Sequence, residues 1–170
     1  MVRGAFHHAL IIPATFLYNQ PKKLGNDAKR LRREALYDSE DLARHLANYV
    51  MNQIPTLSVS HISSKDVITP DIWSDPSRIY ACLFAKASRI LFLVTRQDID
   101  AFSDFITQRF QPLLERAEAM DYSWKSRFLV VAMGEFQLVD SLPCEVIRFR
   151  EIGWFRDSMA LFILGKKIQG

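Results

Sequence analysis

Histidine and cysteine are the side chains most able to bind metal ions or act as nucleophiles, and this chain of 170 residues holds few of them. The two cysteines, Cys82 and Cys144, are far apart, form no CxxC pair and have no evident basic partner. Adjacent His7 and His8 would point to opposite faces of a strand, which is poor metal geometry. No HExxH motif or Cys/His cluster includes the remaining histidines, His45 and His61. We therefore predict no catalytic residue and no metal site.

Phosphate binding is the next chemistry to consider, because flavodoxin-like enzymes hold phosphates on glycine-rich loops at helix N-termini. The chain has six glycines, and none lies in residues 13–18, directly after the first apolar run. Neither a Walker A motif nor a GxGxxG motif is present. We expect no nucleotide to bind by this route, and we predict no cofactor.

Basic side chains gather in one polar segment at about residues 18–38, which we interpret as a basic insertion. Such a segment could bind an acidic partner, anionic lipid or RNA, and the alternative, which we favour, is a solvated loop and helix face. No interleaved aromatic residues offer a stacking platform, and the net charge is only +3, so we expect no nucleic-acid partner. The basic residues are Lys22, Lys23, Lys29, Arg30, Arg32 and Arg33.

The overall composition fits one globular domain over residues 1–170. Hydrophobic residues make up 49% and charged residues 24%, which disfavours disorder. The two isolated cysteines indicate a reducing compartment. No apolar run is long enough to cross a bilayer, so we expect no membrane insertion within the chain.

The strand pattern predicts an α/β fold with a five-stranded parallel sheet in the flavodoxin-like order 2-1-3-4-5 and helices on both faces. Residues 89–95 and 128–133 are apolar without alternation, which is typical of parallel strands buried on both faces. Residues 56–62 and 144–149 alternate, as expected of edge strands. The first strand is predicted at residues 9–12 and ends at Pro13.

Helical spacing and capping residues predict the helices between these strands. Asn26 could cap a short helix to Leu36, and Asp38 or Ser39 a second helix that ends at Pro55. The longest helix begins near Ile99 and should be kinked or interrupted by Pro112. The other expected helices start at Thr69-Pro70, resume after Pro76 over 77–85, and close the chain over 154–163, with Gly165 as the helix end.

From residue 86 onward the chain resembles the SEFIR branch of the Toll/interleukin-1 receptor (TIR) superfamily, the cytoplasmic domain of interleukin-17 receptors and their adaptor. The stretch ASRILFLVT at 87–95 resembles the family's third strand, and 102–114 resembles its long helix, rich in Phe and Leu. The stretches RFLVVA at 127–132 and LPCEVIRF at 142–149, with the helix at 155–164, resemble its last strands and helix. The resemblance covers roughly half of the chain, as a pattern rather than a rigid signature.

This resemblance implies an intracellular signalling domain, of a receptor or a free adaptor in innate immunity, that binds other SEFIR or TIR-like domains and self-associates. It implies a cytoplasmic location, which includes the cytoplasmic part of a membrane receptor. Some TIR relatives cleave NAD with a glutamate on the helix after the third strand. The matching stretch, 97–104, has aspartates only, and the first glutamate on that helix is Glu115. We therefore predict a binding module rather than an enzyme, and the alternative is a NAD-cleaving or nucleotide-binding enzyme.

Two surfaces are the candidate contact sites of such a module. The resemblance motivates the first, residues 61–78, and its exposed charge pattern motivates the second, residues 97–109. Trp73 could anchor an interface in the first surface, as aromatic residues often do, whereas we favour core packing for Trp154 and Phe155. The candidate interaction residues are Trp73, Asp75, Arg78, Asp98, Asp100, Asp104 and Arg109.

Overall fold

The computed structural model describes residues 6–17, 26–62, 70–134, 136 and 142–166. Within the two helical segments that start at residues 26 and 70, the side chains of 26–29, 31–37, 70 and 71 are not described.

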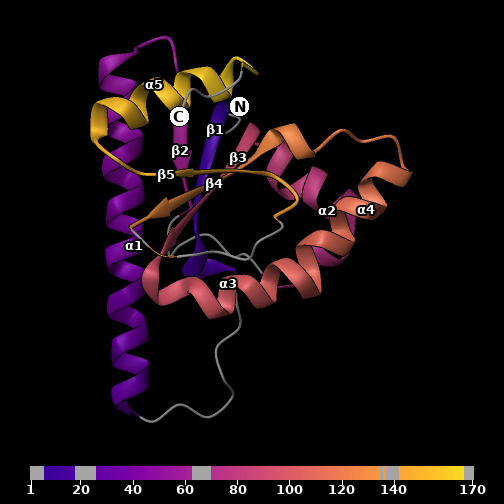
Figure 1. The fold of residues 1–170 in the computed structure, drawn as a ribbon, viewed down its shortest axis with the longest axis horizontal. Helices are drawn as coiled ribbons and strands as arrows, with labels where there is room; N and C mark the ends of the chain where they lie inside the picture. Colours follow the sequence, from indigo (N-terminus) through magenta and orange to yellow (C-terminus); the bar gives the residue numbers. More distant parts are fainter. Residues whose placement is uncertain (1–5, 18–25, 63–69, 135, 137–141, 167–170) are drawn as a thin grey trace, which may run out of the picture.

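The described strands form one five-stranded sheet in the order β2-β1-β3-β4-β5, and each neighbouring pair is parallel. This confirms the predicted α/β architecture with β3 at the centre (Figure 1). The edge strand β2 is shorter than predicted, with three residues instead of seven. The strands are β1 His7–Pro13, β2 Val59–His61, β3 Ala87–Thr95, β4 Phe128–Met133 and β5 Glu145–Arg148.

Alternate residues of the inner strands point to opposite faces of the sheet, so the molecule has two hydrophobic cores. On β3, Phe92 lies in the core under α2 (Pro76–Ile79), α3 (Ile99–Phe105) and α4 (Gln111–Ala119). Its neighbour Leu93 lies in the core under α1 (Asn26–Gln53) and α5 (Ile152–Ile163). This explains why the β3 sequence is apolar without alternation: both faces are covered.

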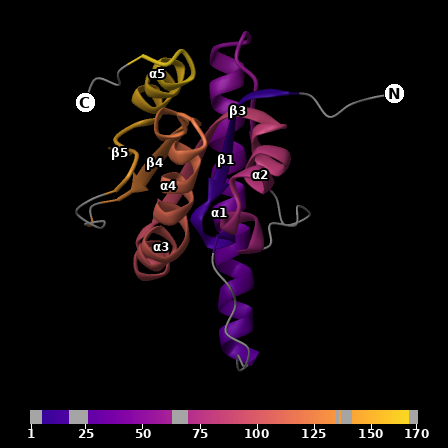
Figure 2. The same cartoon turned by 90° about the vertical axis from the view of Figure 1, so that its right-hand side faces the viewer.

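Helix α1 is continuous, so the prediction of two helices with a cap at Asp38 or Ser39 was wrong. No glycine or proline lies between residues 26 and 53, so nothing breaks the helix at the predicted boundary. Its 28 residues make a helix about 42 Å long. Its N-terminal part projects beyond the sheet (Figures 1 and 2), and the exposed Arg30 lies on that part.

The helix after β3 runs from residue 99 to residue 119, and it changes register in the middle. A π turn, η5 (Ile106–Phe110), joins α3 to α4 directly before Pro112. A proline has no N–H to donate to the carbonyl four residues earlier and clashes with it, so a wider turn here accommodates Pro112. The predicted interruption at this proline therefore takes the form of a π turn.

Shorter turns complete the chain. Helix α5 ends as predicted at Gly165, which has a φ of 72°. The Gly165 N–H donates to the carbonyl of Phe162 and the Lys166 N–H to the carbonyl of Leu161, which makes a Schellman motif. The short turns are η1 Ala14–Phe16, η2 Pro70–Ser74, η4 Arg96–Asp98 and η6 Lys125–Arg127, and a π turn, η3 Tyr80–Phe84, extends α2.

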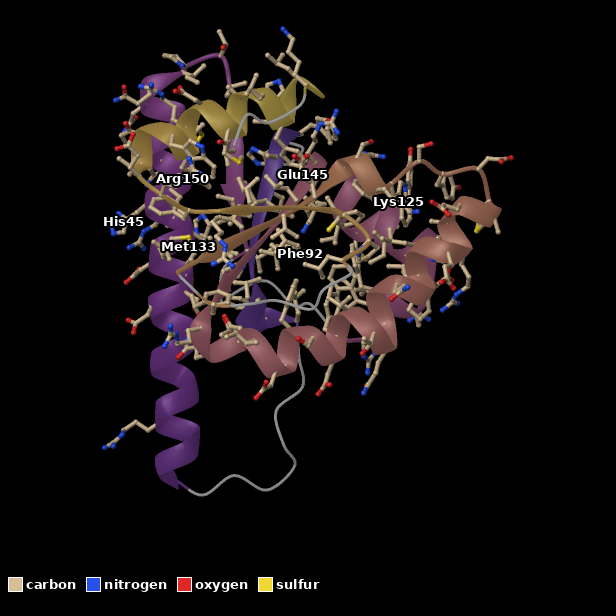
Figure 3. The ribbon with its side chains drawn as sticks, viewed as in Figure 1. His45, Phe92, Lys125, Met133, Glu145 and Arg150 are labelled. Carbon is tan, nitrogen blue, oxygen red and sulfur yellow. The ribbon has the colours of Figure 1, made fainter. Side chains whose placement is uncertain are left out.

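Phe92 is the central side chain of the larger core and lies between the sheet and its helices (Figure 3). It is fully buried and makes edge-to-face or stacked contacts with Phe102, Phe105, Phe110 and Phe128. A large-to-small change here removes these contacts and leaves a cavity.

We predict that Phe92→Ala lowers the free energy of unfolding by about 3–5 kcal/mol, measured by urea denaturation with tryptophan fluorescence. The matched control is Phe6→Ala, because Phe6 is 58% exposed, and it should change stability by less than about 0.5 kcal/mol. Equal losses for the two variants would contradict this account of the core.

Candidate functional site

The two predicted contact surfaces meet at one pocket of about 210 Å³. Trp73 and Ser74 come from η2, in the first surface, and Gln108 and Arg109 come from η5, in the second. Arg116 on α4 completes the lining. We call these five residues the arginine pocket, and its polar walls carry two guanidinium groups.

Trp73 lies beneath this pocket rather than on the surface. It is fully buried and packs edge-to-face on Phe92, Phe105 and Phe110, with ring centroids 5.9, 5.0 and 6.4 Å apart. The prediction that Trp73 could be an exposed interface anchor was therefore wrong, because the apolar area of the ring is used inside the core. Trp124 is buried as well.

Asp75 stands between the pocket and the start of α2. Its carboxylate accepts a hydrogen bond from the backbone N–H of Ser77 at 3.0 Å and so caps the helix. That bond, the Ser77 side chain and the nearby Arg78 and Arg116 hold the pKa of Asp75 below its ordinary value. Asp75 is therefore a half-exposed anion beside the pocket, and Arg78 is exposed nearby.

Asp98 was predicted to lie on an exposed contact surface, but it is buried and stabilises the start of a helix. It is fully buried, and one carboxylate oxygen accepts bonds from the backbone N–H and the hydroxyl of Thr95, at 3.1 and 2.7 Å. The Thr95 side chain in turn accepts from the backbone of Asp98, which makes a capping box. Asp98 thus begins the helix after β3.

Asp100 and Asp104 are exposed, as expected of contact residues, and lie one turn apart on α3. Further along the same helix, Arg109 is half-buried and Arg116 is exposed. The outer side of this helix therefore carries two carboxylates in its first half and both signs of charge in its second half, where Glu115 and Glu118 are exposed too.

Sequence reasoning missed Ser74, Gln108 and Arg116 as pocket residues. A usable signal existed for one of them, since Arg109 and Arg116 are seven residues apart, which is about two helical turns. No local pattern links that helix to Ser74, which lies more than thirty residues earlier.

The structure describes only part of the basic segment. Lys22 and Lys23 lie outside the described residues, and Lys29, Arg32 and Arg33 lie on α1 with side chains that are not described. Arg30 is the member whose exposed side chain the structure describes.

Histidines near the start of the sheet have structural roles. His7 Nδ1 lies 2.7 Å from Ser58 Oγ, and the Ser58 backbone N–H donates to His8 Nδ1 at 3.0 Å. These bonds tie β1 to the residue before β2. Within the described ranges, no group of three or more His, Cys, Asp or Glu side chains is placed to hold a metal ion. No described helix is long and apolar enough to cross a membrane.

Glu115, the glutamate relevant to the enzyme alternative, is exposed on α4. It lies about 24 Å along the helix from Ile99, where the helix leaves the end of β3. Ligands of open α/β sheets bind at the carboxyl ends of the strands. Glu115 is therefore on the flank of the molecule rather than at that edge.

Cys144 and Cys82 differ in their surroundings. Burial raises the pKa of the Cys144 thiol to about 12, with a further contribution from Glu145. Cys144 packs against the larger core, whereas Cys82 is exposed on η3. Because only the thiolate is reactive, the two thiols should differ in alkylation rate.

We predict that a brief treatment of the native protein with iodoacetamide at pH 8 modifies Cys82 and leaves Cys144 unmodified in mass spectrometry. With a pKa of about 12, about one Cys144 thiol in ten thousand is ionised at pH 8, and the fraction rises with pH. Unfolding in urea should make both react. Fast modification of Cys144 in the folded protein would disprove this.

Comparison of the chain with known proteins found no matching family model, no matching curated protein and no matching solved structure.

Proposed function

We propose that this domain is an intracellular signalling module that binds related SEFIR or TIR-like domains by homotypic contact. It acts through binding rather than catalysis, in the cytoplasm, as part of a receptor or as an adaptor. The resemblance over residues 87–95, 102–114, 127–132, 142–149 and 155–164 supports this proposal, and so does a parallel sheet in the order 2-1-3-4-5. The observation that carries it furthest is the arginine pocket, where both candidate contact surfaces meet.

The size of the pocket favours a protein partner over a nucleotide. Sites for small molecules and cofactors usually enclose about 300–1,000 Å³ and bury most of the ligand. A pocket of about 210 Å³ is smaller than that range and suits one or two side chains of a partner.

The chemistry of the pocket favours an acidic partner side chain. Arginine presents a planar fork of N–H donors that matches a carboxylate, and charge-assisted bonds of this kind are stronger than neutral ones. Gln108 and Ser74 add neutral polar groups to the same walls. Arg78 is a third arginine nearby, and the carboxylate of Asp75 lies close to Arg78 and Arg116.

We predict that Arg109→Glu/Arg116→Glu weakens binding to the cytoplasmic SEFIR domain of an interleukin-17 receptor by at least about tenfold, measured by co-precipitation and by titration calorimetry. Reversing both charges puts carboxylates where the partner's carboxylate must lie.

The matched control is Arg148→Glu/Arg150→Glu, which changes two exposed arginines at the far edge of the sheet and should bind normally. Circular dichroism must show that both variants are folded. Unchanged binding by the pocket variant would remove this surface from the proposal.

A further inference from the structure

Resting on the proposed function, we propose that the arginine pocket binds a phosphomonoester on a side chain of the partner, so that the contact depends on phosphorylation of the partner. Arg109 and Arg116 bind the phosphate oxygens from the walls of the pocket. The indole N–H of Trp73 donates to one of these oxygens from the floor of the pocket.

The indole N–H of Trp73 is the observation that points to a ligand. Trp73 lines the pocket and is fully buried, and its Nε1 has no hydrogen-bond partner among the described residues. A buried tryptophan usually has an acceptor for this N–H, because an unmade hydrogen bond of a buried donor costs free energy. An oxygen of a ligand seated in the pocket would supply the missing acceptor.

The pocket offers more donors and more positive charge than one carboxylate can use. Each of its two guanidinium groups has five N–H donors, and Gln108 and Ser74 add an amide and a hydroxyl to the walls. A carboxylate has two oxygens and a single charge, whereas a phosphomonoester has three terminal oxygens and a charge of about −1.5 to −2 at pH 7. The phosphomonoester is therefore the better match to this set of donors.

None of the described residues that line the pocket is acidic. Asp75 lies close enough to Arg116 for the two charges to interact, so its carboxylate competes with a bound anion. Ser74 and Arg109 have further interactions within the protein, so the inference depends most on Arg116 and on the N–H of Trp73. The described acids on the neighbouring turns are Asp75, Asp104, Glu115 and Glu118.

The test follows the indole N–H signals of the full chain by ¹H–¹⁵N NMR while a blocked tripeptide, alanyl-phosphoseryl-alanine, is added up to about 10 mM, a range that detects millimolar affinity. The Trp73 signal should move downfield and saturate, because a charge-assisted hydrogen bond forms. The signals of the other two tryptophans should stay in place. Trp154 is the internal comparison, because its Nε1 also lacks a partner but lies on α5.

Two further tripeptides define the chemistry that is recognised. The peptide with unmodified serine should cause no shift of the Trp73 signal. The peptide with glutamate in place of phosphoserine should bind at least about fivefold more weakly, because it has fewer oxygens and less charge.

Three variants locate the site. Arg116→Gln should weaken binding of the phosphopeptide by at least about tenfold, because it removes a charged donor. Asp75→Asn should tighten binding by about two- to fivefold, since the repulsion is lost while an asparagine can still cap α2. Arg148→Gln is the matched control, because it removes an exposed arginine from the edge strand β5, and it should bind as the wild type does.

Several results would overturn the inference. These are a Trp73 signal that does not move with the phosphopeptide, a glutamate peptide that binds as tightly, or Asp75→Asn binding more weakly than the wild type. Inorganic phosphate that binds more tightly than the phosphopeptide would indicate a site for a free anion instead of a side chain of the partner.

Failure of this inference is distinguishable from failure of the proposed function, because the peptide titration uses this chain alone. If the phosphopeptide does not bind, loss of receptor-domain binding by Arg109→Glu/Arg116→Glu would still support the proposed function. If the phosphopeptide binds and no related domain does, the phosphate site stands and the homotypic role is rejected.

Discussion

The packing of Phe92 against both its own sheet and the helices above it is the constraint on which the rest of the structure depends. Its ring contacts Phe128 on the neighbouring strand and Phe102 and Phe110 on the helix after β3. A large planar side chain at the centre of the sheet fixes how close that helix can lie. Trp73 then fills the space between this helix and η2, at 5.0 Å from the ring of Phe105. The arginine pocket is what remains above the indole, so its geometry depends on the aromatic core.

The π turn before Pro112 shows how a constraint on the backbone affects which side chains line the pocket. A regular helix through Pro112 would clash with the preceding turn, and the wider turn of η5 makes room for the proline ring. The same turn carries Gln108 and Arg109, so the wider backbone that accommodates the proline also sets their direction. Such π turns occur frequently at functional sites. Here the link is physical, because the residues that change register are the residues that line the pocket.

The sheet was predictable because its signals are local. A parallel strand that is covered on both faces needs a continuous apolar run. Residues 90–94 and 128–132 are such runs, and all of them are buried. The Gly165 helix end was predictable for the same reason, since a left-handed residue favours glycine. The pocket was not, because η2 and η5 meet only through tertiary packing. Helix α1 was misjudged at Ser39, since a residue that can cap a helix can also lie within one.

Charge on the helix after β3 is confined to its outward side because the core occupies the other positions. Phe102, Phe105 and Phe110 are required by the core, and Asp98 is required by the capping box. Only the outward positions of this helix remain free to differ in charge and to contact a partner. Asp100 in the first turn favours the helix dipole, whereas the last turns carry Arg116 between Glu115 and Glu118. The aromatic core therefore decides which positions can be charged, and the packing of the helix against η2 decides which charges, those of Arg109 and Arg116, line the pocket.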